Sequence, residues 1–309
     1  MPILPSTRKF WQEANRIKNY PLTEKIHGFL YLSFPFFYIA TGTGSNRLGK
    51  FGQRVIALVN RFFPRKSARP GQITFPDTYH GKVVPLHSAR ELVSIKENIR
   101  IDDLEKVIPY QLARSIVIAH PQALVALDCP CRVARENPCL PLDVCLIVGE
   151  PFASFTLEHH PKRSRSITRE VAIAILEAED ARGHVHHAFF KEAVLQRFYA
   201  ICNCCSCCCG AMQAHQSGTP MLASSGYSAQ VDQTECLGCG ECNSYCQFNA
   251  LSMEEGVSHV NLEKCMGCGV CVSHCEHNAI QLILNSEKGI PLEMSRYHTS
   301  DGSETFQIS

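Results

Sequence analysis

The sequences CLGCGECNSYC, at residues 236–246, and CMGCGVCVSHC, at residues 265–275, decide the fold of the C-terminal part of this chain. In both, the cysteines follow a C-x2-C-x2-C-x3-C spacing, in which three thiolates bind one iron–sulfur cluster and the fourth binds a second cluster. Glycines at positions 238, 240, 267 and 269 keep the space between the ligands free of bulky side chains. We therefore expect two clusters here. Structural zinc also uses C-x2-C pairs, but it does not account for the third and fourth cysteines of each motif.

These two motifs resemble the bacterial-type ferredoxins with two 4Fe-4S clusters, and the resemblance covers about residues 229–285. It implies a pseudo-two-fold, ferredoxin-like dicluster domain in which the motifs exchange their fourth ligands. The first cluster would be held by Cys236, Cys239, Cys242 and Cys275, and the second by Cys265, Cys268, Cys271 and Cys246. One departure is visible: the proline that usually follows the fourth cysteine is Gln247 in the first motif and Glu276 in the second. Both replacements restore a backbone N–H and change the rigidity of the turn.

Composition limits the remaining possibilities. Of 309 residues, 30 are basic and 29 acidic, which argues against nucleic-acid binding, and we find no complete nucleotide-binding motif. All 18 cysteines fall within residues 129–145, 202–209, 236–246 and 265–275, unlike the even spacing of a small disulfide-bonded secreted protein. The first residues do not form a signal peptide. We expect a cytoplasmic protein, with a peripheral position on the inner face of the membrane as an open alternative.

Residues 1–70 are interpreted as an amphipathic and aromatic arm. The apolar run at residues 26–40 is too short to span a bilayer as a helix. Residues 51–63 place apolar side chains at helical spacing, with basic residues in and around them. Such a pattern favours packing against the protein core or a partner subunit, and it also suits an anionic membrane surface.

Residues 71–216 are expected to form a cysteine-rich α/β module. The pattern predicts helices from Ser88, from Pro109 to Ile118 and over 168–181, and a buried strand at 123–127. This strand leads to four candidate metal ligands: Cys129, Cys131, Cys139 and Cys145. On an extended chain, Cys129 and Cys131 would face the same way. An additional iron–sulfur cluster, a structural zinc and reduced or redox-active thiols remain alternative interpretations.

A second group of cysteines closes the module. The candidate ligands there are Cys202, Cys204, Cys205, Cys207, Cys208 and Cys209. If the chain were extended, Cys205, Cys207 and Cys209 would face one side and the other three the opposite side. The tripeptide Cys208-Cys209-Gly210 resembles one copy of the motif of heterodisulfide reductase subunits, which makes Cys208 and Cys209 the candidates for contact with a substrate. His186, shortly before this group, is a further candidate ligand.

The sequence as a whole predicts an α+β protein. Residues 217–228 would be a linker, 229–285 the dicluster domain and 286–309 a polar tail. The chain also resembles iron–sulfur proteins of anaerobes that carry an additional cysteine-rich N-terminal module. We expect electron transfer between two 4Fe-4S clusters and one or two further upstream iron–sulfur clusters, with redox proteins as donor and acceptor in an anaerobic complex. The alternative is an oxidoreductase that acts on a disulfide, a sulfur compound or a quinone at the upstream site, so the choice between electron carrier and enzyme stays open.

Overall fold

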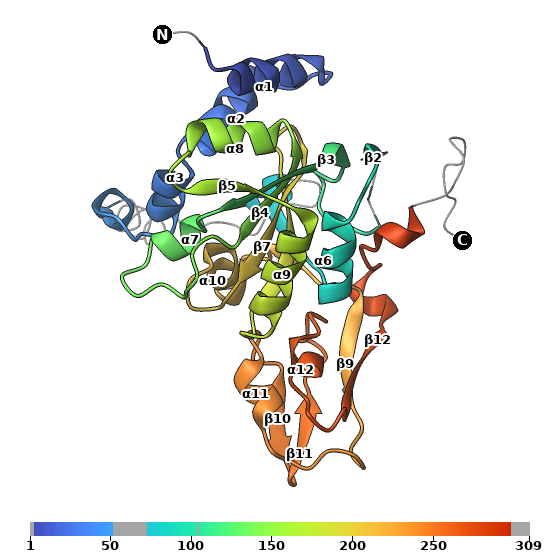
Figure 1. Cartoon of the computed structure of the whole chain (residues 1–309). Coiled ribbons are helices and arrows are strands. Elements are labelled where there is room, and N and C mark those ends of the chain that lie inside the picture. The colour runs from blue at the N-terminus through green and yellow to red at the C-terminus, as the bar shows by residue number, and fades with distance from the viewer. Residues whose placement is uncertain (1–2, 52–72, 103, 105, 298–309) are drawn as a thin grey trace.

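The computed structural model describes residues 3–51, 73–102, 104 and 106–297 (Figure 1). Its main body is built on a mixed sheet with the strand order β2-β3-β4-β7-β6-β1-β8, and β5 pairs with the C-terminal part of β3. Neighbouring strands are antiparallel except β1 and β8, which are parallel. The strands are β1 (Tyr79–Val83), β2 (Ile99–Ile101), β3 (Ile116–Leu127), β4 (Cys145–Glu150), β5 (Ser164–Ile167), β6 (Val185–Lys191), β7 (Arg197–Cys204) and β8 (Leu222–Ala223).

Helices cover both faces of this sheet (Figure 1). One face packs against α6 (Leu86–Val93) and α9 (Arg169–Asp180), with Leu146 and Val148 of β4 in that core. The opposite face carries Cys145 and Ile147, in a second core that includes residues of α8 (Phe152–His159). Because side chains alternate along a strand, β4 contributes its cysteine to the α8 face only. Short helices α5 (Phe75–Thr78), α7 (Pro130–Val133) and α10 (Gly210–Gln216) complete this part of the chain.

Three helices at the N-terminus pack over the α8 face. They are α1 (Pro5–Arg16), α2 (Leu22–Ser33) and α3 (Pro35–Gly42). Phe10 of α1 is fully buried and meets Phe155 of α8 edge to face, with ring centroids 5.9 Å apart. The hydroxyl groups of Tyr31 and Tyr199 are 2.8 Å apart and join α2 to β7. The apolar run at residues 26–40 thus forms parts of α2 and α3 with one side on the core, and the amphipathic stretch at 51–63 lies, beyond residue 51, outside the described residues.

The C-terminal unit projects from the main body (Figure 1). It consists of two antiparallel pairs, β9 (Tyr227–Val231) with β12 (Ile280–Leu284) and β10 (Leu251–Glu254) with β11 (Val257–Val260). Helices α11 (Glu241–Tyr245) and α12 (Val270–Ser273) each follow a glycine with positive φ, at positions 240 and 269. Within the described residues, no helix is both long and apolar enough to cross a membrane.

This unit is fastened to the main body at both of its ends. Before β9, the Ser225 backbone N–H donates to the Met266 carbonyl at 3.0 Å, and its hydroxyl donates to the Gly267 carbonyl at 2.7 Å. After β12 come the 3-10 turns η1 (Ser286–Lys288) and η2 (Met294–Arg296). The Met294 N–H donates to Glu91 Oε2 of α6 at 2.7 Å, and the Met294 side chain is buried. The expected linker at 217–228 contains β8, and the expected tail is packed against α6 at Met294.

Several predicted elements are confirmed. The strand at 123–127 is the second half of β3, and the helix at 168–181 is α9, capped by the Thr168 hydroxyl and followed by Gly183 at φ +79°. The helix predicted from Pro109 to Ile118 is wrong, since β3 begins at Ile116 and pairs with β2 and β4. Strand pairing along the sheet edge overrides the local helical pattern there.

Candidate metal centres

The eight cysteines of the C-terminal unit line two separate small cavities. Cys236, Cys239, Cys242 and Cys275 border one cavity. Cys246, Cys265, Cys268 and Cys271 border the other. Each cavity takes three cysteines from one motif and the fourth from the other, which is the grouping that the resemblance to two-cluster ferredoxins implies. Iron binding by these thiols stays a prediction, and the side chains are in position for it.

Glycine is required at the tip of each cysteine loop. A Cβ on Gly238 would lie 2.0 Å from the Gly256 carbonyl oxygen, and one on Gly267 would lie 2.1 Å from the Tyr227 carbonyl oxygen. Both glycines also have positive φ, which favours residues without a side chain. The first loop therefore closes on the β10–β11 hairpin and the second on the start of β9, next to the main body. Accordingly, we call the cavity bordered by Cys236, Cys239, Cys242 and Cys275 the distal cavity. The cavity bordered by Cys246, Cys265, Cys268 and Cys271 is the proximal cavity.

Backbone N–H groups point at the sulfur atoms of both cavities. The Ala250 N–H donates to Cys246 Sγ at 3.2 Å, and the Ala229 N–H donates to Cys265 Sγ at 3.5 Å in the proximal cavity. In the distal cavity, the Ser258 N–H donates to Cys236 Sγ at 3.5 Å. Hydrogen bonds to cluster sulfurs are one of the levers by which a protein sets reduction potential.

The ten upstream cysteines divide into two groups. Four of them have Sγ atoms that all lie within 4.8 Å of one another: Cys139, Cys205, Cys207 and Cys208, here called the tight group. The other six line an apolar cavity of about 210 Å³: Cys129, Cys131, Cys145, Cys202, Cys204 and Cys209, here called the cavity group. Cys205 and Cys208 also border this cavity, so the two groups are neighbours.

The sheet explains how the cavity group assembles. Three of these cysteines face the same side of the sheet. Cys145 on β4 lies opposite Cys202 on β7 in the strand register, and Cys204 lies two residues after Cys202 on the same strand. Cys129 and Cys131 follow β3, and Cys209 caps α10. The end of β3, the start of β4 and the end of β7 therefore converge on one face, next to α3.

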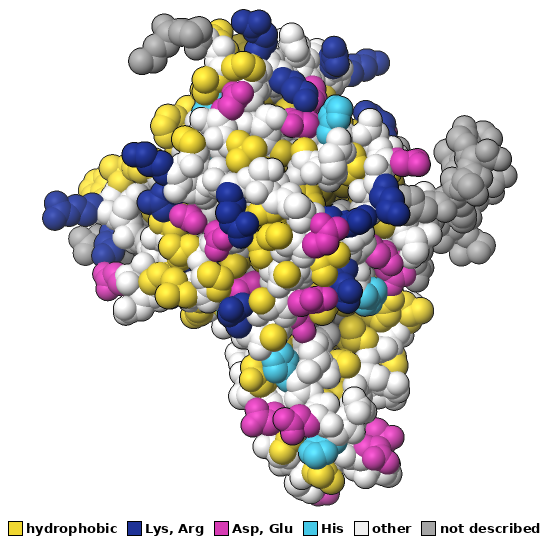
Figure 2. Space-filling view, in the orientation of Figure 1, with side chains coloured by type: hydrophobic (Ala, Val, Ile, Leu, Met, Phe, Trp, Pro, Cys, Tyr) yellow, Lys and Arg dark blue, Asp and Glu magenta, His cyan; other side chains and the backbone are white. Residues whose placement is uncertain are grey.

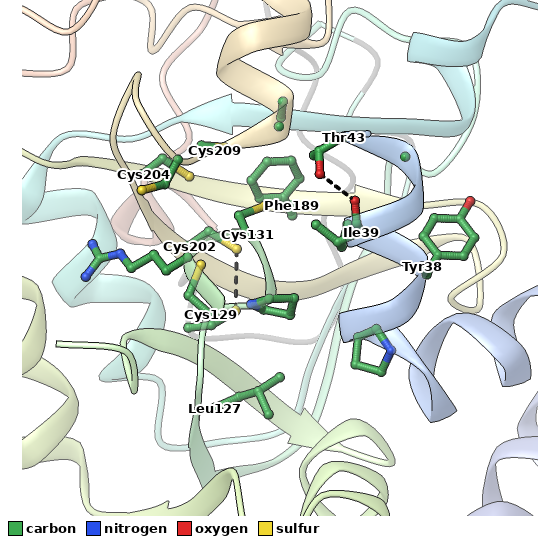
Figure 3. Close-up of a pocket in the computed structure, with 18 of the residues that line it drawn as sticks. Tyr38, Ile39, Thr43, Leu127, Cys129, Cys131, Phe189, Cys202, Cys204 and Cys209 are labelled. Atoms are coloured by element: carbon green, nitrogen blue, oxygen red, sulfur yellow. Dashed lines mark hydrogen bonds between the residues drawn. The ribbon is translucent and has the colours of Figure 1, made fainter. Parts of the chain in front are cut away.

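Contacts between thiols connect the cavity group (Figure 3). Cys145 and Cys202 have Sγ atoms 3.5 Å apart. The Cys131 thiol is hydrogen-bonded to the thiols of Cys129 and Cys209, and the Cys209 thiol is also hydrogen-bonded to that of Cys204. The bond with Cys145, followed by burial, raises the pKa of the Cys202 thiol well above its ordinary value. A metal that binds here must therefore displace protons from these thiols.

Aromatic side chains form the rest of the cavity wall. Tyr31 and Tyr38 come from α2 and α3, Phe189 from β6 and Tyr199 from β7. Lys191 lies behind this wall, with its Nζ 4.7 Å from the centre of the Tyr31 ring. The cavity is thus apolar on the aromatic side and lined with sulfur on the other.

A buried ion pair supports the sulfur side. Arg132, one residue after Cys131, donates to Glu179 of α9 and to the Asn203 carbonyl, and it lies 3.0 Å from His184 Nδ1. Burial raises the pKa of the Glu179 carboxyl, but hydrogen bonds from His184 and Arg132 outweigh burial and the pKa is lowered. The positive charge of Arg132 therefore lies in a fixed position beside the thiols.

The chain is not extended at either group of cysteines. Pro130 starts the short helix α7 and Cys129 occupies its N-cap position, although Cys129 and Cys131 still line the same cavity, as expected. Likewise, β7 ends at Cys204 and the chain then turns, so strand alternation does not apply to residues 205–209. As a result, the neighbours Cys208 and Cys209 belong to different groups. No paired use of these two candidate substrate-contacting thiols follows from the fold.

His186 lies on β6, away from both groups. Its Nδ1 is 2.6 Å from Asn203 Oδ1, and its Nε2 is 3.8 Å from Asp180 Oδ1. It borders neither the cavity nor the tight group in the part of the chain that the structure describes. The structure therefore does not bring this candidate ligand together with the cysteines.

Two residues next to the tight group were not selected from the sequence. Arg135 donates to the Cys208 carbonyl, at 3.2 Å from Nε and 2.9 Å from Nη2. Gln247 accepts hydrogen bonds from the Ser206 N–H and hydroxyl, both at 2.9 Å. The only signal for Gln247 was its departure from the usual proline, and there was no signal for Arg135.

Comparison with known proteins supports the C-terminal unit alone. The family described as "4Fe-4S binding domain" matches residues 229–252 and 259–281. No curated protein and no solved structure matches the chain. Residues 229–281 are therefore a 4Fe-4S binding domain, which indicates iron–sulfur electron transfer, and the upstream module carries no such assignment.

Proposed function

We propose that this protein relays electrons between the two clusters of its 4Fe-4S domain and a further iron–sulfur cluster held by the cavity group. The observation that carries this proposal is the convergence of six thiols from three separate chain segments on one apolar cavity, in the same chain as a 4Fe-4S domain. Four thiolates suffice for one cluster. The remaining two would be free for another use.

The arrangement of the sites supports a linear path. The proximal cavity is bordered by Cys246, whose neighbour Gln247 contacts Ser206 of the upstream module. Ser206 lies between two members of the tight group, which adjoins the cavity group. Electrons arriving at the distal cavity would thus pass the proximal cluster before they reach the upstream cavity.

Charge favours the tip of the 4Fe-4S domain as the docking surface. Residues 229–285 contain seven acidic residues and one lysine, whereas the chain as a whole is nearly neutral. On the face seen in Figure 2, acidic and histidine side chains, and no basic ones, lie at the end of this domain. A redox partner with a basic surface would be attracted to this end, and the association would weaken as salt increases.

Metal analysis of the full chain tests the relay. We expect about twelve irons per chain, eight in the 4Fe-4S domain and four upstream. Replacing Cys204 by serine should remove about four irons and leave the electron paramagnetic resonance of the domain clusters intact. About eight irons in the unaltered chain would rule out the upstream cluster, and no loss of iron in Cys204→Ser would rule out Cys204 as one of its ligands.

A second function is favoured by the Cys145–Cys202 contact and the aromatic wall. If a cluster uses the other four thiols of the cavity group, this pair remains beside a space large enough for a small substrate. Two electrons from the clusters and two protons from solvent would convert a substrate disulfide to two thiols, or a quinone to a quinol. The Cys145→Ser variant should then keep its iron and lose reduction of such an acceptor, whereas an unchanged rate would exclude a role for the pair.

Membrane association is proposed for the outer face of α2 and α3. Ile26, Leu30, Phe34 and Phe37 are each more than two-fifths exposed there. Exposed large apolar side chains on neighbouring helices suit a membrane surface or a partner. In flotation assays, the unaltered protein should float with anionic vesicles and the Phe37→Glu variant should not. Equal flotation of both proteins would exclude this face as the membrane contact.

A further inference from the structure

We propose that the tight group, Cys139, Cys205, Cys207 and Cys208, binds a single zinc ion. This ion would hold the loop at residues 205–209, here called the cysteine loop, against the 4Fe-4S domain. The site is separate from the relay proposed above, and its occupation does not depend on an upstream iron–sulfur cluster.

The distances between the sulfur atoms fit one tetrahedral ion. Cys139 Sγ lies 3.3 Å from Cys207 Sγ and 3.6 Å from Cys205 Sγ, and Cys207 Sγ lies 3.7 Å from Cys208 Sγ. A zinc–thiolate bond of about 2.3 Å in tetrahedral geometry separates the ligands by about 3.8 Å. The tight group therefore needs only small adjustments to close around a zinc ion.

The same distances do not suit a four-iron cluster. In such a cluster each thiolate binds a different iron, and four irons and four sulfides lie between the ligands. In the tight group all four sulfur atoms lie within 4.8 Å of one another, which leaves no space between them for the eight atoms of a cluster. The 4Fe-4S domain offers a comparison within one molecule: its eight cysteines surround cavities. Within the described part of the chain, none of these eight cysteines belongs to a group whose sulfur atoms all lie within 4.8 Å of one another, as those of the tight group do.

The ligand set and its surroundings indicate a structural ion. Four protein thiolates complete the coordination of zinc and leave no position for a substrate or water, as in closed structural sites. Arg135, whose guanidinium group contacts the Cys208 carbonyl, would offset part of the resulting negative charge. Cys207 is exposed, so the ion can enter from solvent.

The site joins two chain segments that are distant in the sequence. Cys139 lies between α7 and β4, and the other three ligands lie between β7 and α10. Ser206, flanked by two of the ligands, donates both its N–H and its hydroxyl to Gln247 Oε1. Gln247 directly follows Cys246 of the proximal cavity. Zinc would thus order the surface on which the 4Fe-4S domain rests.

Zinc and iron counts on the full chain test this proposal with matched variants. We expect about one zinc per chain, and its loss in Cys139→Ser and in Cys207→Ser with the iron content unchanged. Cys145→Ser, which alters a thiol of the cavity group, should keep the zinc. Absence of zinc, a single iron in its place, retention of zinc in Cys139→Ser, or a loss of about four irons in that variant would each overturn the assignment.

Spectroscopy on the unaltered protein decides the matter if the variants do not fold. X-ray absorption at the zinc edge is not affected by the iron clusters, and it should show four sulfur neighbours at about 2.3 Å. Nitrogen or oxygen neighbours would refute a tetrathiolate site. Failure of the relay proposal would appear as about eight irons, and failure of the present one as missing or differently coordinated zinc, so the two outcomes are distinguishable.

Discussion

The contact between Gln247 and the cysteine loop yields the sharpest prediction. Gln247→Ala removes the oxygen that accepts the N–H and the hydroxyl of Ser206, both at 2.9 Å. It keeps the Gln247 carbonyl, which accepts from Gln216 Nε2 at 3.2 Å. The substitution therefore removes two specific bonds between the 4Fe-4S domain and the upstream module and leaves the backbone contact in place.

The size of the effect follows from those two bonds. A hydrogen bond in a protein contributes a net free energy of about 1 kcal/mol, so the loss amounts to about 2 kcal/mol. Because 1.4 kcal/mol is a factor of ten in an equilibrium constant, the open form of the cysteine loop should become about 30-fold more populated. The Ser206 amide, now without its acceptor, should exchange faster by a similar factor.

Anaerobic hydrogen–deuterium exchange of the segment 205–216 measures this change. The matched control is Gln230→Ala, which removes an exposed side-chain contact with Gln281 inside the 4Fe-4S domain and leaves the loop contact intact. Exchange at residues 205–216 should accelerate in Gln247→Ala and not in the control. Unchanged exchange in Gln247→Ala, or equal acceleration in both variants, would refute the role of Gln247 as the bridge.

Three further predictions concern the stability of the main body. Burial lowers the pKa of Lys82 to about 7, and an unfolded lysine titrates near 10.4, so the unfolded chain binds more protons and the unfolding free energy should rise with pH between about 7 and 10. Thermal midpoints at pH 6.5 and 9 should show this rise in the unaltered protein and a smaller one in Lys82→Met. Gly183→Ala should lose about 1–2 kcal/mol of unfolding free energy in anaerobic denaturant titrations, because its φ is +79° and a Cβ would lie 2.7 Å from the Tyr245 ring. Arg132→Met should lose about 3–5 kcal/mol, because the buried Glu179 carboxylate loses the guanidinium group and keeps His184 and Arg182 as partners. The double variant with Glu179→Leu should recover most of this loss; absence of recovery would contradict the pairing.

The sequence predicts the C-terminal domain well because its signal is local. Ligand spacing within eleven residues determines each cysteine loop, and the repeat of the motif indicates that there are two. The grouping of Cys246 with the second motif and Cys275 with the first is the same in the structure as in the resemblance. Helix α9 was equally predictable, from the Thr168 cap and the glycine after its end.

The upstream site could not be predicted in the same way because its geometry is set by long-range pairing. Whether Cys208 faces the tight group and Cys209 the cavity group depends on where β7 ends and on what it pairs with. Cys139 joins residues more than sixty positions away, and its spacing from Cys131 and Cys145 has no recognisable period. The number of upstream cysteines indicated a metal site, but their division into a tight group of four and a cavity group of six could be seen only in the fold.

The attachment of the 4Fe-4S domain at both ends has a consequence for how turnover is limited. Ser225 holds it where the chain enters, and Met294 holds the chain to α6 where it leaves. A domain anchored in this way cannot swing between a donor and an acceptor as a mobile carrier does. In the relay proposed above, its clusters would therefore be fixed in position, and the slow event would be the arrival and departure of the partner at the far tip. Turnover should accordingly depend on partner concentration and ionic strength, with no separate step for domain rotation.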